Sequence, residues 1–144
     1  MSKHLKVLVV DDDLVILEIA RARLEKMGHE VTTRSSAIGT TAAIIREKPD
    51  VVLMDVEMPV LTGGDLISTI RDNDLVGGPN GVRFILYSGT EPSELQRLAD
   101  ETGALGAIHK AGDAAAFSAA FESLVRALSS GPPFKPTEPG RPAS

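Results

Sequence analysis

The chain has 144 residues, a formal net charge of −5 and no cysteine. This length favours one domain with a tail, the acidic charge argues against a general nucleic-acid binder, and the lack of thiols excludes disulfides and thiolate metal sites. No apolar run reaches the length of a signal segment or a membrane span, so we expect a cytoplasmic protein with neither a membrane nor a nucleic acid as partner.

Apolar runs alternate with stretches of helical period in the first part of the chain. Residues 5–10 form an apolar run that predicts a strand, and the apolar spacing over 14–27 predicts a helix. Gly28 is placed to end that helix in a left-handed conformation. Residues 29–34 alternate weakly and predict a second strand at the sheet edge, and 37–47 predict a second helix, which the following proline ends.

The same alternation continues to about residue 128. Residues 51–54 are apolar on both faces, which is typical of a central strand covered by helices. The further elements that we expect are a helix after Gly63-Gly64, a strand at 84–87, a helix with Thr90 as N-cap and Pro92 in its first turn, a strand at 104–109, and a last helix capped by Asp113.

Five strands in strict alternation with five helices predict an α/β fold, a doubly wound three-layer sandwich with a parallel, flavodoxin-like sheet. Ligands of such sheets bind outside the carboxyl ends of the strands. Side chains that follow the strands therefore decide the function. The residues in these positions are Asp11, Asp12, Asp13, Asp55, Ser88 and Lys110.

The acidic residues among them predict a cation site. Asp11, Asp12 and Asp13 end the first apolar run and Asp55 ends the third, so parallel strands would bring several carboxylates into one crevice. Like charges at close range repel one another unless a cation or a proton relieves them. Mg²⁺ is suited to this, because it takes oxygen ligands and often pairs with a phosphoryl group.

The residues at these strand ends resemble the receiver domain of bacterial two-component response regulators, of the stand-alone type seen in chemotaxis. Four segments carry the resemblance, in the family's order and each at a strand end: 7–13, 51–59, 85–90 and 106–110. The resemblance covers about residues 5–128 and implies the strand order 2-1-3-4-5. We expect a receiver domain over 1–128 and a disordered tail or linker, rich in Pro, Gly and Ser, over 129–144.

The resemblance also implies a role for each residue of the site. Asp55 corresponds to the phosphoacceptor, whose carboxylate attacks a phosphoryl donor to form an acyl phosphate. Asp11, Asp12, Asp55 and the backbone carbonyl of Glu57 correspond to the ligands of Mg²⁺. Ser88 corresponds to the hydroxyl that moves to the new phosphoryl group, and Lys110 to the lysine that pairs with its oxygens.

Each of these residues also has a plainer structural interpretation. Asp55 could be a strand-end acid or an N-cap, Ser88 a turn residue and Lys110 a solvated surface lysine. Asp13 fits the N-cap of the first helix better than a metal ligand.

The chain departs from the family's usual pattern at three positions. Ala111 stands where a proline usually follows the lysine, often with a cis bond, so the loop is expected to be either trans or strained. Ala107 stands where an aromatic switch residue is common, so the signal must leave through another element, such as residues 89–92 and the fourth helix. Glu57, two residues after Asp55, could order or repel the water that hydrolyses the acyl phosphate.

These features predict a phosphorylation-controlled switch. A histidine kinase or phosphotransfer protein would donate the phosphoryl group, and the chain would catalyse only its own phosphorylation and dephosphorylation. The fourth helix, fifth strand and fifth helix would contact an unknown downstream protein or a second copy of the chain. Too few residues follow Leu128 for an output domain.

Two other functions remain as alternatives. One is a scaffold of the same fold that binds without being phosphorylated. The other is a Mg²⁺ phosphohydrolase for small molecules, which usually needs a cap domain that this chain has no room for. Residues 132–136 could form an extended docking peptide or simply a solvated terminus or linker.

Overall fold

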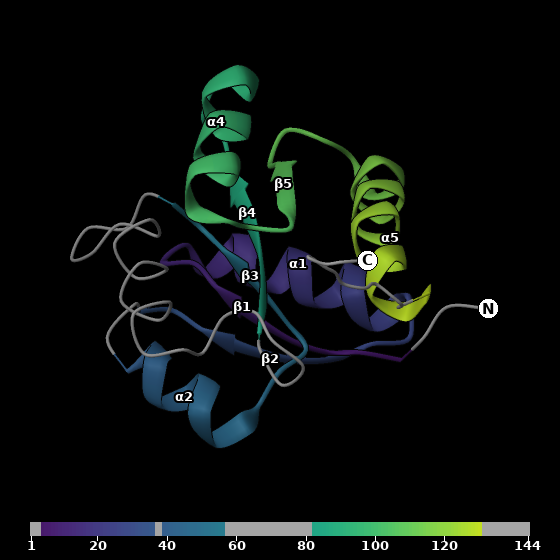
Figure 1. Ribbon diagram of the computed structural model, residues 1–144. Helices are drawn as coiled ribbons and strands as arrows, with labels where there is room; N and C mark the ends of the chain where they lie inside the picture. The colour runs from purple at the N-terminus through teal and green to yellow at the C-terminus, as the bar shows by residue number, and fades with distance from the viewer. Residues whose placement is uncertain (1–3, 37–38, 57–81, 131–144) are drawn as a thin grey trace.

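The computed structural model describes residues 4–36, 39–56 and 82–130, and Figure 1 shows their arrangement. Five parallel strands form one sheet in the order β2-β1-β3-β4-β5, which confirms the predicted fold class and strand order. The strands are β1 Lys6–Val10, β2 Glu30–Arg34, β3 Val51–Met54, β4 Arg83–Ser88 and β5 Gly106–His109. The described helices are α1 Leu14–Lys26, α2 Thr40–Glu47, α4 Pro92–Thr102 and α5 Ala114–Ser130.

Several predicted features lie outside the described residues. They are the helix after Gly63-Gly64, the backbone carbonyl of Glu57, and residues 131–144 of the predicted tail. The tail was predicted to begin at residue 129, which was too early, because helix α5 continues to Ser130. No helix among the described residues is both long enough and apolar enough to cross a bilayer.

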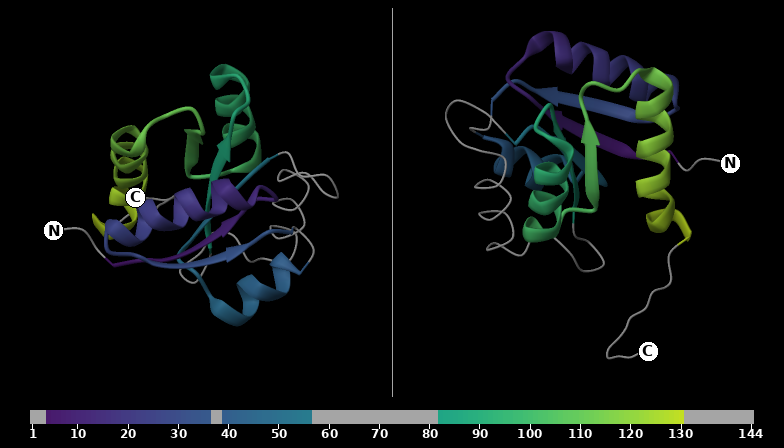
Figure 2. Two further views of the ribbon diagram at one scale, coloured as in Figure 1. Left: turned by 180° about the vertical axis from the view of Figure 1, so that it is seen from behind. Right: turned by 90° about the horizontal axis from the view of Figure 1, so that it is seen from above.

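Helices cover both faces of the sheet, which divides the buried core into two clusters (Figure 2). Successive side chains of a strand point to opposite faces, so Leu86 lies in the cluster under α2 and α4, and Tyr87 in the cluster under α1 and α5. The second cluster contains the aromatic rings of Tyr87, Phe117 and Phe121. The residues that follow β1 and β3 emerge at the edge where the candidate site lies.

Helix α1 has the ends that the sequence predicts. The carboxylate of Asp13 accepts hydrogen bonds from the backbone N–H groups of Val15 and Ile16, at 2.9 and 3.3 Å. Asp13 is therefore the N-cap, as predicted. Gly28 follows the C-cap with a φ of +96°, a conformation that a residue without a Cβ adopts at little cost.

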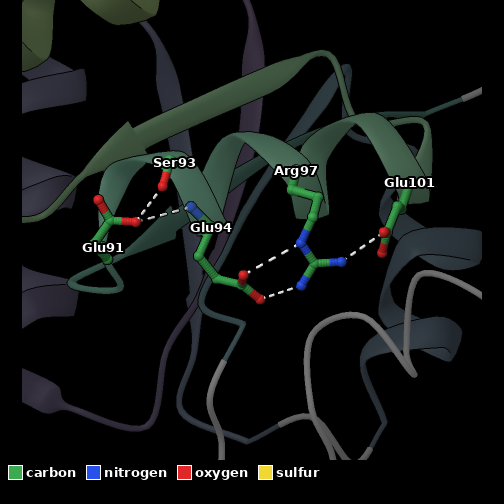
Figure 3. Close-up of polar contacts among 5 residues, drawn as sticks. All are labelled: Glu91, Ser93, Glu94, Arg97 and Glu101. Atoms are coloured by element: carbon green, nitrogen blue, oxygen red, sulfur yellow. Dashed lines mark hydrogen bonds and ion pairs between the residues drawn. The ribbon is translucent and has the colours of Figure 1, made fainter.

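The N-cap of α4 is Glu91, so the prediction of Thr90 was wrong. The Glu91 carboxylate accepts a hydrogen bond from the backbone N–H of Glu94 at 3.2 Å, and it also contacts the Ser93 hydroxyl (Figure 3). Thr90 instead bonds to Ser88, two residues earlier, through its own hydroxyl and its N–H. Pro92 is the first residue of the helix, as predicted.

The exposed face of α4 carries a ladder of charged side chains (Figure 3). The Arg97 guanidinium pairs with both oxygens of Glu94 and, at 2.6 Å, with Glu101. Pairs of this spacing on an exposed helix contribute little to stability, because solvent screens them. The ladder supports the helix locally, and the fold depends far more on the buried clusters.

Four predicted element starts were too early. Strand β1 begins at Lys6 rather than 5. Strand β2 begins at Glu30 rather than 29, because the ring of His29 turns inward, accepts a hydrogen bond from Leu5 N at 3.1 Å and packs on Phe121. Helix α2 begins at Thr40 rather than 37, and strand β5 at Gly106 rather than 104. The prediction that Asp113 caps α5 is confirmed by its hydrogen bond from Ala116 N at 2.9 Å.

Candidate functional site

Strand register places two carboxylates side by side. Val10 of β1 pairs with Met54 of β3, so the next residues, Asp11 and Asp55, leave the sheet at the same level. The backbone N–H of Asp55 donates to the carbonyl of Val10 at 2.9 Å, which extends the pairing by one residue. Both acids are buried, with Asp11 0% and Asp55 4% exposed.

Asp11, Asp12 and Asp55 form a cluster that suits a hard divalent cation. One carboxylate oxygen from each lies within 4.8 Å of the others, and Asp12 is the exposed member. Asp11 Oδ1 accepts a hydrogen bond from Asp13 N at 2.9 Å. Asp11 Oδ2 is buried, and apart from its ion pair with the Lys110 ammonium it accepts no hydrogen bond from a described residue. A buried carboxylate oxygen with this unused capacity fits Mg²⁺.

Lys110 supplies the positive charge of the site. Its Nζ lies 2.7 Å from Asp11 Oδ2 and 3.5 Å from Asp55 Oδ1, with the side chain 20% exposed. Burial acts to lower the pKa of Lys110, but the hydrogen bond and charge of Asp11 together with those of Asp55 outweigh it and raise the pKa above the ordinary value. The ammonium therefore stays charged at neutral pH and partly compensates the two buried acids.

Ser88 reaches the site through its backbone. Its carbonyl accepts a hydrogen bond from Lys110 N at 2.9 Å, which fixes the start of the loop after β5. Its buried hydroxyl lies 2.8 Å from the Thr90 hydroxyl and accepts from Thr90 N at 3.1 Å. The hydroxyl is thus engaged in a local turn, a contact that the sequence analysis did not anticipate.

The sequence also did not predict a contact between Lys110 and the ring of Tyr87. The Lys110 ammonium lies 5.7 Å from the centre of the Tyr87 ring, within the range of a cation–π interaction. The strand pattern could have placed Tyr87 on the α5 face, since it precedes Ser88, but only the fold brings the lysine over it. Ala107 packs against the opposite cluster, and the peptide bonds of the described residues, that before Ala111 included, are trans.

Comparison with known families agrees with this geometry. The family model of the response regulator receiver domain matches residues 7–122, and these residues include Asp11, Asp12, Asp55, Ser88 and Lys110. The chain belongs to this family. The response regulator receivers are signalling switches of two-component systems.

Individual relatives extend the same result. The transcriptional regulatory protein CseB of Streptomyces avermitilis is 32% identical over 140 residues, which are 96% of this chain and 57% of CseB. The chain thus spans little more than half the length of that relative. The BeF3-activated N-terminal receiver domain of Klebsiella pneumoniae RstA shares 26% identity at a TM-score of 0.72, with 84% of this chain and 98% of that chain covered.

A chemotaxis receiver shows the likeness of the fold. The response regulator CheY4 of Vibrio cholerae superimposes with a TM-score of 0.73 over 85% of this chain and 99% of that chain, at 24% identity.

Proposed function

We propose that this chain is the phosphoacceptor of a two-component phosphorelay, with Asp55 as the residue that receives the phosphoryl group. The observation that carries the proposal is the environment of Asp55. Its carboxylate is nearly buried, shares a cluster with Asp11 and Asp12, and lies 3.5 Å from the Lys110 ammonium. A lone strand-end acid needs none of these neighbours.

The proposed donor is a phosphohistidine on a kinase or phosphotransfer protein. A carboxylate oxygen of Asp55 attacks phosphorus, the bond between phosphorus and the donor nitrogen breaks, and its electron pair stays on that nitrogen. Lys110 is charged and already beside Asp55, so it is positioned to pair with the oxygens of the transferred group. Hydrolysis of the acyl phosphate would return the chain to its starting state.

Asp11, Asp12 and Asp55 would hold Mg²⁺ for this reaction, with Glu57 as a further proposed ligand through its backbone carbonyl. When bound, the ion would supply positive charge that offsets the repulsion between these acids and the incoming phosphoryl oxygens. Asp13 stays with the helix, because its carboxylate is engaged in capping α1.

The proposed output is a change in protein contacts. The new phosphoryl group would draw the Ser88 hydroxyl away from Thr90 and so disturb the turn between β4 and α4. A downstream protein, or a second copy of this chain, would read that change on the surface of α4, β5 and α5. A receiver unit over 1–128 and a cytoplasmic location belong to the same proposal.

A phosphorylation assay tests the proposal directly. Incubation with acetyl phosphate and Mg²⁺, followed by intact-mass measurement, should add one phosphoryl group to the wild type and none to Asp55→Asn. Asp100→Asn, which changes an exposed acid on α4, is the matched control and should be modified like the wild type. A wild type that gains no phosphoryl group would favour the scaffold alternative.

A further inference from the structure

We propose that Tyr87 is a positioning residue for Lys110, holding the ammonium at the site through the face of its ring. This inference rests on the proposed function. It gives a role to Tyr87 of β4, which is not among the site residues predicted from the sequence. It starts from the 5.7 Å contact between the Lys110 Nζ and the Tyr87 ring. Tyr87 is 2% exposed, so the lysine meets a ring that is buried from solvent.

The Tyr87 ring is itself held in place. It meets Phe117 of α5 edge to face, with ring centres 5.7 Å apart, and Phe117 stacks on Phe121 at 6.2 Å. The Arg23 guanidinium of α1 lies 5.5 Å from the centre of the Phe117 ring and reaches the carbonyl of Gly112 at 3.5 Å. A side chain packed against two helices in this way is a fixed point, whereas a lysine has a flexible four-carbon stem.

The ring and the carboxylates hold Lys110 in different ways. Asp11 and Asp55 attract it with full charges, but they are also the residues that a divalent cation would occupy. A cation bound there draws on the same oxygens and weakens their hold on the ammonium. The ring face is not a ligand for a hard cation. Tyr87 therefore keeps its hold on Lys110 when the acids are engaged elsewhere.

This contact also lies on the face of the sheet opposite to Ala107. Leu86 pairs with Ala107 in the β4–β5 register and packs on the α4 side, while Tyr87 packs on the α1 and α5 side. A displacement of Lys110 would accordingly change its contact with Tyr87, and through that ring the contact with Phe117. The chain lacks an aromatic residue at position 107 but has one in contact with the lysine itself.

Phosphorylation rates provide the first test. Under acetyl phosphate and Mg²⁺, Tyr87→Leu should slow phosphorylation of Asp55 roughly three- to tenfold, as expected for a partly desolvated cation–π contact. Tyr87→Phe keeps the ring face and should stay within about twofold of the wild type. Phe117→Leu removes a ring from the same cluster without touching Lys110, and so controls for loss of packing.

A double-mutant cycle separates positioning from packing. In a Lys110→Met background, Tyr87→Leu should have no further effect on the rate. The inference is overturned if Tyr87→Leu slows the reaction equally in both backgrounds, or no more than Phe117→Leu does. A wild type that is never phosphorylated would instead refute the proposed function, so the two failures are distinguishable.

Fluorescence gives a readout that does not depend on the rate. Tyr87 is the only tyrosine and the chain has no tryptophan, so its emission reports on this one ring. Lys110→Met should change the emission of the unloaded protein, because it removes the cation from the ring face, whereas loading the wild type with beryllofluoride and Mg²⁺ should change the emission much less. Equal emission from the wild type and Lys110→Met would contradict the inference.

Discussion

The Lys110 ammonium lies closer to Asp11 than to Asp55, at 2.7 Å against 3.5 Å. The lysine thus occupies the oxygen of Asp11 that is free of other hydrogen bonds among the described residues. If Mg²⁺ binds the same carboxylate, the ammonium and the metal compete for it. The positions of these three side chains then predict how metal binding and stability depend on the lysine.

Lys110→Met should make the metal-free protein less stable, because Asp11 and Asp55 lose their compensating charge. We expect a loss of about 1–3 kcal/mol, less than for a fully buried pair since the lysine is 20% exposed. Saturating Mg²⁺ should stabilise the variant more than the wild type, because no ammonium competes. Urea denaturation with and without Mg²⁺ measures both effects. Lys26→Met, an exposed lysine of α1, should show neither.

Asp12 and Asp13 are adjacent exposed acids, and the structure predicts opposite effects of replacing them. Asp12→Asn should weaken Mg²⁺ binding about tenfold or more with little loss of stability, because it removes one of three clustered carboxylates. Asp13→Ala should cost about 1 kcal/mol of stability, because it removes the N-cap of α1. Isothermal titration calorimetry and urea denaturation of both variants check this. Equal loss of metal affinity in the two would show that Asp13 is also a ligand.

Ser88→Ala should separate phosphorylation from its structural consequence. Asp55 should still gain a phosphoryl group, but α4 should respond less, because no hydroxyl is left to move from Thr90 to the phosphoryl oxygens. The measurement is the change in amide chemical shifts of α4 on loading with beryllofluoride and Mg²⁺. Ser88→Thr retains the hydroxyl and should restore the response. A full response from Ser88→Ala would exclude this route.

His29 should make the protein less stable in mild acid. Burial and the nearby His4 lower the pKa of His29, against a smaller opposing effect of Glu122. Its Nδ1 accepts a hydrogen bond from the N–H of Leu5. Protonation of Nδ1 would break this hydrogen bond, because the ring N–H and the backbone N–H would then face each other as two donors. A lowered folded-state pKa contributes stability above the unfolded value of about 6.5, and this stability is lost as pH falls through the folded value.

The dependence on His29 can be measured by urea denaturation at pH 7.5 and pH 5.5. The wild type should lose up to about 1.4 kcal/mol per pH unit more than His29→Gln does below pH 6.5. His4→Gln, at an exposed histidine, should retain most of the wild-type slope. An identical slope in wild type and His29→Gln would disprove the assignment.

The apolar pattern predicted a parallel sheet with acids at its edge, and the resemblance to receiver domains predicted the strand order. Four-residue apolar runs such as Val51–Met54 have one place in a doubly wound fold, and the acids that follow them share an edge through register. The choice between neighbouring residues as the N-cap of α4 was harder to predict. Thr90 has the residue type of an N-cap, yet it bonds Ser88 and leaves the cap to Glu91, whose longer side chain reaches Glu94 N.

Contacts of long side chains across the fold were not predictable either. The strand pattern says which face Tyr87 occupies, but the position of the Lys110 ammonium depends on the course of its flexible stem. The inward turn of His29 likewise depends on Leu5 and Phe121, which are far away in sequence. The roles proposed for Glu57 and for the tail concern residues that the structure does not describe.

The pairing of Val10 with Met54 has a consequence for how this chain can be altered. Swapping one aliphatic side chain for another within β1 or β3 leaves the following carboxylate where it is. Deleting a single residue from either strand would turn that carboxylate toward a helix-covered face, because neighbouring side chains alternate between faces. Tolerance to substitution and intolerance to length change should therefore coexist in the same two short stretches of backbone.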